Sequence, residues 1–177
     1  MPRVVSQVTG AQWEKDGPQS PTPKFFKQYV NAVDSRGYDS GSGLKFYSKD
    51  VIFHNQNGAV YYGGDEMWAW MKKLFDVFER IHHDLIQFLE VERDDGTSQI
   101  YTQNIRNLWL RGNKGDKPTV SIPVTIIAII GKSGSDETEG LHFKEVWLYW
   151  DTALLLPHLP KEAVVFKTEN VLHRNKD

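Results

Sequence analysis

The chain has 177 residues, of which 40% are hydrophobic and 12% aromatic, so it has the size of one compact domain with a large core. Lysine and arginine total 21 against 23 aspartate and glutamate residues, and no basic block stands out, so the sequence predicts no nucleic-acid partner. It contains no cysteine, which excludes disulfides, thiolate zinc sites and cysteine nucleophiles.

The first 22 residues are rich in glycine, proline, serine and glutamine, and they predict a flexible leader over 1–22. This segment lacks the continuous apolar region of a signal peptide. The longest apolar run, IPVTIIAII, is shorter than the roughly 20 residues that span a bilayer as a helix. We therefore expect a cytoplasmic protein that is not inserted in a membrane.

Two amphipathic helices are predicted in the first half of the chain. In TPKFFKQYVNAVDSRG, Thr22 is the expected N-cap, Pro23 suits the first turn, and apolar residues recur with helical spacing. The segment from about Asp65 to Arg80 has the strongest helical periodicity. Between these helices we expect a helical turn in GLKFYSKD, then two short strands, VIFHNQNG and AVYYGG, joined about Asn57-Gly58.

After Ile81 the apolar residues alternate with period two, as in long strands. The segments that show this alternation are HDLIQFLEVE, SQIYTQNIRNLWLRG, TVSIPVTIIAII and LHFKEVWLYW. Helices followed by a meander of antiparallel strands predict an α+β layer architecture, with the helix at about 65–80 packed on the concave face of the sheet. Residues 161–177 form a polar C-terminal tail that could dock through Val164, Val165 and Phe166.

This order of elements, together with FHNQNG…YYGGDE, HHDLIQFLEVE and KEVWLYWDTALLLPHL, resembles the nuclear transport factor 2-like superfamily and, within it, the SnoaL-like polyketide cyclase group. The resemblance covers about Phe25 to Pro160 and implies one domain at 23–160. It implies a cone in which a curved antiparallel sheet packs against N-terminal helices around an apolar pocket. Many members use this pocket for acid–base chemistry without a cofactor, or to bind an apolar small molecule.

The same resemblance aligns the last strand with a cyclase pattern, Glu-His-Trp-Asp, that is followed three places later by a second Asp. Glu145 and Trp147 match this pattern, and Asp151 matches the second Asp. Leu148 stands where the cyclases carry their acid/base carboxylate. Wider members of the superfamily often have an aromatic–Asp pair like Trp150-Asp151 at this point.

Asp151 and His54 are the candidate catalytic residues. Asp151 follows large aromatics and precedes leucines, so it is either the N-cap of a short helix or a pocket-rim carboxylate whose raised pKa suits a general base. The resemblance places His54 near the pocket mouth, where an imidazole could move a proton. The alternative is a histidine hydrogen-bonded to the turn about Asn57-Gly58.

Candidate binding residues lie on the strand YTQNIRNLWL, where alternation puts Asn104 and Arg106 on one face. If this face is inward, the two could hold a carbonyl or enolate oxygen; otherwise Arg106 lies on a solvated surface. His82 and His83 point to opposite faces of a strand, so at most one enters a cavity, and no histidine spacing predicts a metal site. Large aromatics could line a ligand pocket or fill the core: Trp68, Trp70, Trp147, Tyr149 and Trp150.

The sequence and the resemblance together predict a cofactor-free enzyme of the isomerase, dehydratase or cyclase type. Its substrate would be an apolar, carbonyl-bearing small molecule such as a polyketide-like metabolite. The alternative is a non-catalytic module of the same fold that binds a hydrophobic ligand or another protein chain, and Leu148 favours it. A third possibility is water elimination by a His and Tyr pair, as in scytalone dehydratase.

The strand TVSIPVTIIAII is apolar on both of its faces, since Ile127 and Ile129 lie opposite the face that carries Ile126 and Ala128. A sheet buried on one side only would alternate apolar with polar residues. We therefore expect the second face to be buried as well, either by the C-terminal tail or by a second subunit. Members of the resembled superfamily often pair through this sheet, so we expect a homodimer.

Overall fold

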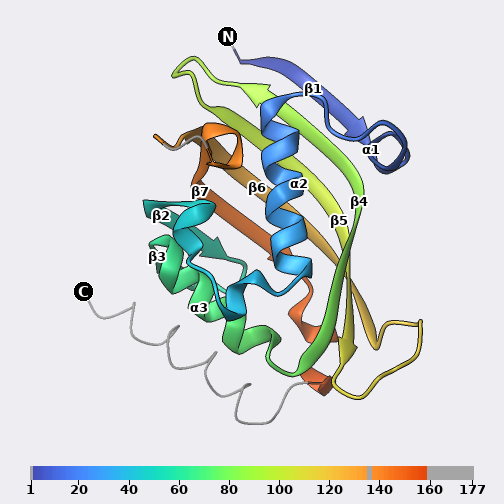
Figure 1. Ribbon diagram of the computed structural model, residues 1–177. Coiled ribbons are helices and arrows are strands. Elements are labelled where there is room, and N and C mark those ends of the chain that lie inside the picture. The colour runs from blue at the N-terminus through green and yellow to red at the C-terminus, as the bar shows by residue number, and fades with distance from the viewer. Residues whose placement is uncertain (1, 135–136, 159–177) are drawn as a thin grey trace.

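The computed structural model describes residues 2–134 and 137–158, which form one curved sheet with helices on its concave side (Figure 1). The strands follow the order β1-β4-β5-β6-β7-β2-β3. Neighbouring strands are antiparallel except β2 and β7, which run parallel. The predicted meander therefore occupies the middle of a mixed sheet.

The strands are β1 Arg3–Thr9, β2 Tyr47–Asn55, β3 Val60–Tyr62, β4 Phe78–Glu92, β5 Ser98–Leu110, β6 Val120–Lys132 and β7 Leu141–Trp150. The helices are α1 Gly10–Asp16, α2 Pro21–Asp34 and α3 Gly64–Phe75. The 3₁₀ turns are η1 Gly37–Asp39, η2 Gly43–Lys45, η3 Glu137–Gly140, η4 Thr152–Leu154 and η5 Leu156–His158. Within the described part of the chain, no helix is both long and apolar enough to cross a membrane.

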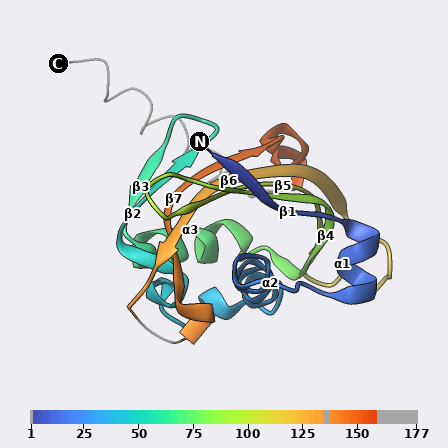
Figure 2. The same ribbon diagram turned by 90° about the horizontal axis from the view of Figure 1, so that it is seen from above.

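The sheet curves over α2 and α3, as the view from above shows (Figure 2). Shifts of register bend the strands, at Leu85/Gln87 between β4 and β5 and at Ile129/Ile130 between β6 and β7. The apolar faces of α2 and α3 and the concave face of the sheet form one continuous core. This arrangement confirms the predicted α+β fold, with helices packed in the hollow of a curved sheet, but the sheet is mixed and not wholly antiparallel, because β2 joins β7 in parallel.

The segment predicted as a leader is folded from Arg3 onward, so the boundary at residue 22 is wrong. β1 pairs with β4 from Arg3 opposite Glu92 to Thr9 opposite Gln87. Thr9 then begins α1 with a capping box, in which its side chain accepts from the backbone of Gln12. Pairing with a distant strand explains why local composition did not reveal this structure. The C-terminal tail at 161–177 lies outside the described residues.

Both predicted helices are present, with shifted ends. α2 begins at Pro21 after Ser20, rather than after Thr22. α3 ends at Phe75, five residues before the predicted Arg80. Beyond Phe75 the side chain of Arg36 donates to the carbonyls of Phe75 and Phe78, over 3.1 and 2.5 Å. Arg36 thus provides a donor for the carbonyl at the end of α3, which has no partner within the helix, and for the carbonyl of Phe78, the first residue of β4.

A close backbone contact fixes the start of α3. A Cβ on Gly43 would lie 2.0 Å from the carbonyl oxygen of Gly64, so only glycine fits at this position. The side chain of Asp65 adds hydrogen bonds from the backbone N–H of Gly43 at 3.0 Å and from the hydroxyl of Ser42 at 2.7 Å. The contact positions α3, which carries part of the wall of the first of two cavities between the helices and the sheet.

We predict that Gly43→Ala lowers the free energy of unfolding by about 1–3 kcal/mol, because the added methyl must push η2 away from α3. Gly131→Ala is the matched control, since a Cβ there would meet only side-chain atoms at 3.4 Å or beyond. Chemical denaturation of the two variants and the wild type measures both effects. Equal stability of the two variants would contradict the proposed contact.

Candidate active site

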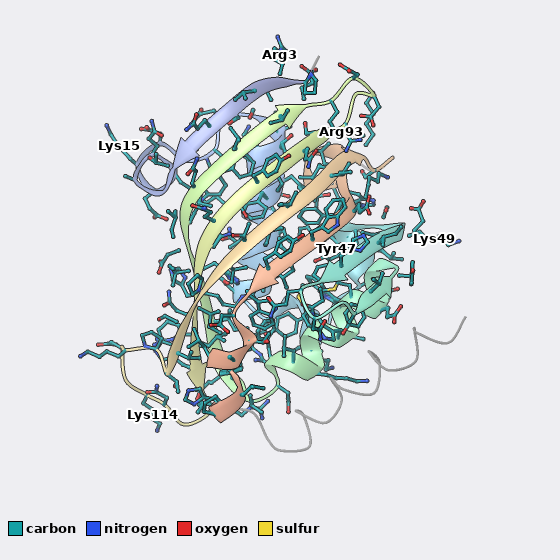
Figure 3. All side chains as sticks on the ribbon, turned by 180° about the vertical axis from the view of Figure 1, so that it is seen from behind. Arg3, Lys15, Tyr47, Lys49, Arg93 and Lys114 are labelled. Carbon is teal, nitrogen blue, oxygen red and sulfur yellow. The ribbon has the colours of Figure 1, made fainter. Side chains whose placement is uncertain are left out.

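Two small cavities lie between the sheet and the helices, and they meet at Tyr29, Arg106 and Ile126, which line both. The first is otherwise lined by Tyr47, Phe53, Met67, Trp70, Met71, Phe75, Phe143, Val146 and Leu148. The second is otherwise lined by Phe26, Val30, Val33, His83 and Asn104. Each has a volume of about 10 Å³, which is about the room that one water molecule needs. Figure 3 shows the side chains from behind the sheet, with Tyr47 labelled.

Arg106 is placed at these cavities by the alternation of β5. Thr102, Asn104 and Arg106 all face the concave side, and each is at most 5% exposed. The guanidinium carbon of Arg106 lies 5.1 Å from the ring centroid of Phe75 and 5.0 Å from that of Trp150. Such cation–π contacts partly replace the hydration that a buried charge loses. Of the two placements that the sequence allowed, the structure has the inward one.

Arg106, His83 and Asp34 form a hydrogen-bonded chain. Nε of Arg106 donates to Nε2 of His83 over 2.7 Å. Nδ1 of His83 lies 2.5 Å from Oδ1 of Asp34, and the backbone N–H of His83 donates to Oδ2 over 3.0 Å. Because arginine can only donate, Nε2 of His83 must accept, so the imidazole carries its proton on Nδ1 and donates it to Asp34. The last residue of α2 therefore orients a histidine of β4.

The imidazole of His83 is neutral near pH 7. Burial lowers its pKa, the positive charge of Arg106 lowers it further, and the hydrogen bond and charge of Asp34 oppose both. The side chain is only 4% exposed, which explains why burial dominates. Burial also lowers the pKa of Arg106, although an arginine keeps its proton in proteins. A neutral base thus lies between a carboxylate and a cation.

One nitrogen of the buried guanidinium lacks a protein partner. Nη1 of Arg106 has no hydrogen-bond acceptor among the residues that the structure describes. A buried donor left unsatisfied costs about 1–3 kcal/mol, and more when it is charged. This N–H group is therefore available to an oxygen atom of a ligand.

Two tyrosines add a second donor to the same cavity. The hydroxyl of Tyr47 donates to that of Tyr29 over 2.8 Å, and both side chains line the first cavity. Burial raises the pKa of each, so both remain protonated near neutral pH. Because Tyr29 accepts from Tyr47, its own proton is free to be donated. The site therefore offers two donors, on Tyr29 and Arg106, close to one base, His83.

The two residues expected to be catalytic do not reach these cavities. Asp151 is exposed, and its carboxylate accepts from the backbone N–H of Ala153 over 2.9 Å as the N-cap of η4. This is the capping alternative that the sequence allowed. Asp151 lines neither cavity.

His54 lies on the opposite face of the sheet from the cavities, so its expected place near the pocket mouth is wrong. Alternation along β2 gives the cavity side to Phe53. Nε2 of His54 lies 2.8 Å from Oε1 of Glu145, and its ring stacks on that of Trp147 with centroids 5.1 Å apart. The alternative hydrogen bond to the Asn57-Gly58 turn is replaced by this contact with β7.

The candidate binding residues divide between the two faces. Asn104 lines the second cavity, and Trp150 packs on Arg106. Trp68 is part of the core, where its ring packs 6.0 Å from Phe46. Trp147 and Tyr149 lie on the convex face, since Val146 and Leu148 take the cavity side of β7. Leu148 therefore lines the first cavity at the position where the resembled cyclases carry a carboxylate.

Sequence analysis missed Asp34, Tyr29 and Tyr47, and did not select His83. The sequence carried half of the signal for His83, since one histidine of the pair had to face inward. The choice of His83 needs the register, which places it directly opposite Arg106. Asp34 gave no local signal, because its role depends on where α2 ends relative to β4. Among the described residues, no group of three or more His, Asp or Glu side chains could hold a metal ion.

Comparison with known proteins shows similarity in structure but not in sequence. No family model matches the chain, and no curated protein matches it. Solved structures match over most of its length. ActVI-ORFA from Streptomyces coelicolor is 11% identical with a TM-score of 0.60, over 74% of this chain and 95% of that protein. Nuclear transport factor 2 from Cryptosporidium parvum is 11% identical with a TM-score of 0.55, over 82% and 100%.

This chain has the nuclear transport factor 2-like fold. A protein from Shewanella denitrificans that is assigned to the SnoaL-like polyketide cyclases matches as well, at 13% identity and a TM-score of 0.52, over 77% of this chain and 95% of that one. The resemblance noted in the sequence is thus confirmed as a likeness of fold. Both cavities lie between the helices and the sheet of this nuclear transport factor 2-like fold.

The lowered pKa of His83 predicts that part of the stability is lost in mild acid. Below about pH 6.5 the unfolded chain protonates this imidazole while the folded protein does not, so the unfolded state binds more protons and stability falls as pH falls. We expect the melting temperature to fall more steeply between pH 7.5 and 5.5 in the wild type than in His83→Gln. Calorimetry at several pH values measures the two slopes. Identical slopes would show that His83 is not held neutral.

Proposed function

We propose that this protein is a cofactor-free enzyme that moves a proton on an apolar, carbonyl-bearing small molecule, as isomerases, dehydratases and cyclases do. The observation that carries the proposal is the chain Asp34–His83–Arg106, in which a neutral, oriented imidazole lies beside two free hydrogen-bond donors at small cavities between the sheet and the helices. Enolisation requires a base close to donors that can stabilise the oxygen where negative charge develops. The likeness of fold to a SnoaL-like cyclase supports the same class.

Each residue has a distinct role in this proposal. The hydroxyl of Tyr29 and Nη1 of Arg106 hold the carbonyl oxygen, where negative charge develops when a proton leaves the adjacent carbon. Nε2 of His83 takes that proton once its hydrogen bond from Nε of Arg106 has broken. Asp34 then stabilises the imidazolium that forms. Asn104, beside His83 in the second cavity, adds a polar contact. A His and Tyr pair is therefore available for water elimination too.

A substrate larger than water must displace side chains to enter. Met67 and Met71 of α3 line the first cavity, and methionine side chains adapt easily because they are unbranched and have several rotatable bonds. We propose that the substrate enters along α3 and that these side chains close over its apolar part. The remaining lining, which includes Phe53, Trp70 and Phe143, suits a ring or a short hydrocarbon chain.

The proposal predicts exchange of α-protons of ketones in D₂O. A panel of 1-indanone, 2-tetralone and 1,3-cyclohexanedione, followed by proton NMR, tests enolisation without knowledge of the natural substrate. We expect the wild type to accelerate exchange and His83→Gln to slow it by at least about 100-fold, because positioned general bases contribute about 10²–10⁴. His54→Gln and Asp151→Asn are the controls and should keep the wild-type rate.

Two outcomes would contradict this assignment. Exchange that survives in His83→Gln, with the variant shown to be folded by circular dichroism, would remove His83 from the mechanism. Loss of exchange in Asp151→Asn, with unchanged melting temperature, would restore the carboxylate at the end of β7 as the proton acceptor. Asn still caps η4, so that variant should fold normally.

Ligand binding without catalysis is the second candidate function. Leu148 favours it, because this cavity-lining residue occupies the position of the acid/base carboxylate in the resembled cyclases. Binding of the same ketones without any exchange would support this candidate. A cytoplasmic location remains a prediction for either function.

We also propose that the protein is a homodimer that pairs through the convex face of the sheet. A row of mainly apolar side chains crosses this face, because the register aligns Leu89, Tyr101, Ile127, Trp147 and His54 on adjacent strands. Tyr101 and Tyr149 on this face are 39% and 49% exposed. A contiguous apolar patch of this kind is typical of an interaction surface.

If the dimer forms, replacing Ile127 and Ile129 with lysine should give a folded monomer, because two charges would be buried in a self-complementary interface. Light scattering coupled to size-exclusion chromatography measures the mass. Glu14→Lys, on the exposed side of α1, is the charge-change control and should stay dimeric. A wild-type protein that remains monomeric at high concentration would overturn the proposal and favour the C-terminal tail as the cover.

A further inference from the structure

The charge of Arg106 is incompletely compensated inside the protein. Its side chain is 5% exposed, and its Nη1 has no acceptor among the described residues. Asp34 is the carboxylate that acts on it, but the neutral ring of His83 lies between them. A buried cation without a nearby opposite charge is costly, so this site favours a partner that brings negative charge.

No other group at the cavities competes with an anion. Of the side chains that line them, only Arg106 carries a formal charge near neutral pH, because His83 is neutral and both tyrosines are protonated. No carboxylate lines either cavity. The formal charge that the cavity lining presents to a ligand is therefore the positive charge of Arg106, although the whole chain has a formal net charge of -2.

The geometry of the guanidinium selects among anions. The Nε edge is occupied by His83, and the rings of Phe75 and Trp150 hold the guanidinium plane. What remains open is the Nη end, where Nη1 has no acceptor among the described residues, and the end of a planar guanidinium suits the oxygens of a carboxylate.

We infer that the site takes an apolar carboxylic acid, whose carboxylate binds the Nη end of Arg106 while its hydrocarbon part lies against Met67, Met71 and Phe143. This inference rests on the proposed function in one respect: both assign the substrate to the same cavity. It adds that the substrate is an anion before any proton moves. The carbonyl to be enolised would then belong to an oxo acid. Its carboxylate takes the place of the carbonyl oxygen at Nη1 of Arg106, and the carbonyl oxygen keeps the hydrogen bond from Tyr29 alone.

The test compares each acid with the amide of the same shape, which lacks the charge. Acetate, butyrate, benzoate and 3-phenylpropionate, and the four matching amides, are titrated into the wild-type protein by isothermal calorimetry. We expect each acid that binds to do so at least tenfold more tightly than its amide, with affinity rising along the series as more apolar surface is buried. Equal affinity of acid and amide would overturn the inference.

Variants of Arg106 locate the binding site. Arg106→Gln should weaken the binding of benzoate at least tenfold, and Arg106→Lys should weaken it by less, because lysine keeps the charge but lacks the planar fork. Arg80→Gln is the matched control, since Arg80 also packs on a tryptophan, with its guanidinium 3.8 Å from the ring centroid of Trp109, but on the exposed surface. It should bind benzoate as the wild type does.

The outcomes separate this inference from the proposed function. Benzoate binding that is retained in both Arg106 variants, or absent from the wild type at tens of millimolar, would overturn the carboxylate site whatever the exchange assay shows. Tight, Arg106-dependent binding in a protein that exchanges no ketone would support the site and contradict the enzyme. If Arg106→Gln does not fold, Arg106→Lys and the comparison of acid with amide still decide the result.

Discussion

The buried guanidinium of Arg106 is the constraint on which the rest of the site depends. A charge at this depth persists only if hydrogen bonds and aromatic faces replace the water that it has lost. The fold provides both: His83 accepts from Nε, and Phe75 and Trp150 present their rings. These partners come from β4, α3 and β7, so one side chain of β5 links the elements that enclose the cavities.

Two helices end where their last residues contribute to the surroundings of Arg106. α2 ends at Asp34, which places its carboxylate against His83 at the point where β4 passes. α3 ends at Phe75, whose ring packs beside Arg106, and the chain then turns directly into β4. Had α3 continued to Arg80, as its periodicity suggested, Phe78 and Arg80 could not pair with β5 at the start of β4. The tertiary contact thus overrides the local helical propensity.

The elements of the fold were largely predictable, because they depend on periodicity. The four long strands, the hairpin about Asn57-Gly58 and both helices follow from apolar spacing and turn residues in the sequence. β1 was missed because its partner, β4, lies some 80 residues further along the chain. Local composition carries no information about such a pairing, and Gly, Pro and Ser between 17 and 22 suggested a linker instead.

The site was less predictable, because it depends on which face of each strand is inward. Asn104 and Arg106 were proposed because alternation along the strand puts both side chains on one face. That conclusion does not depend on which face of the strand is buried. His54 and Asp151 were proposed from the resemblance and from their apolar surroundings, and the structure places them on the convex face and in a helix cap. The choice between His82 and His83 required the register of β4 with β5, which sequence patterns do not give.

In the proposed mechanism the base, His83, lies at a different position from the carboxylate of the resembled cyclases. Leu148 of β7 and His83 of β4 lie on different strands of the same concave face, and their cavities meet at Arg106 and Ile126. A carboxylate at 148 would lie in the same closed space as the guanidinium and would neutralise it. With leucine there, no carboxylate of this strand lines the cavity beside Arg106. In the function proposed above, the charge of Arg106 is then free to bind a ligand, and His83 is the base. Under that proposal, the leucine at 148 and the unpaired charge of Arg106 belong to one chemical arrangement.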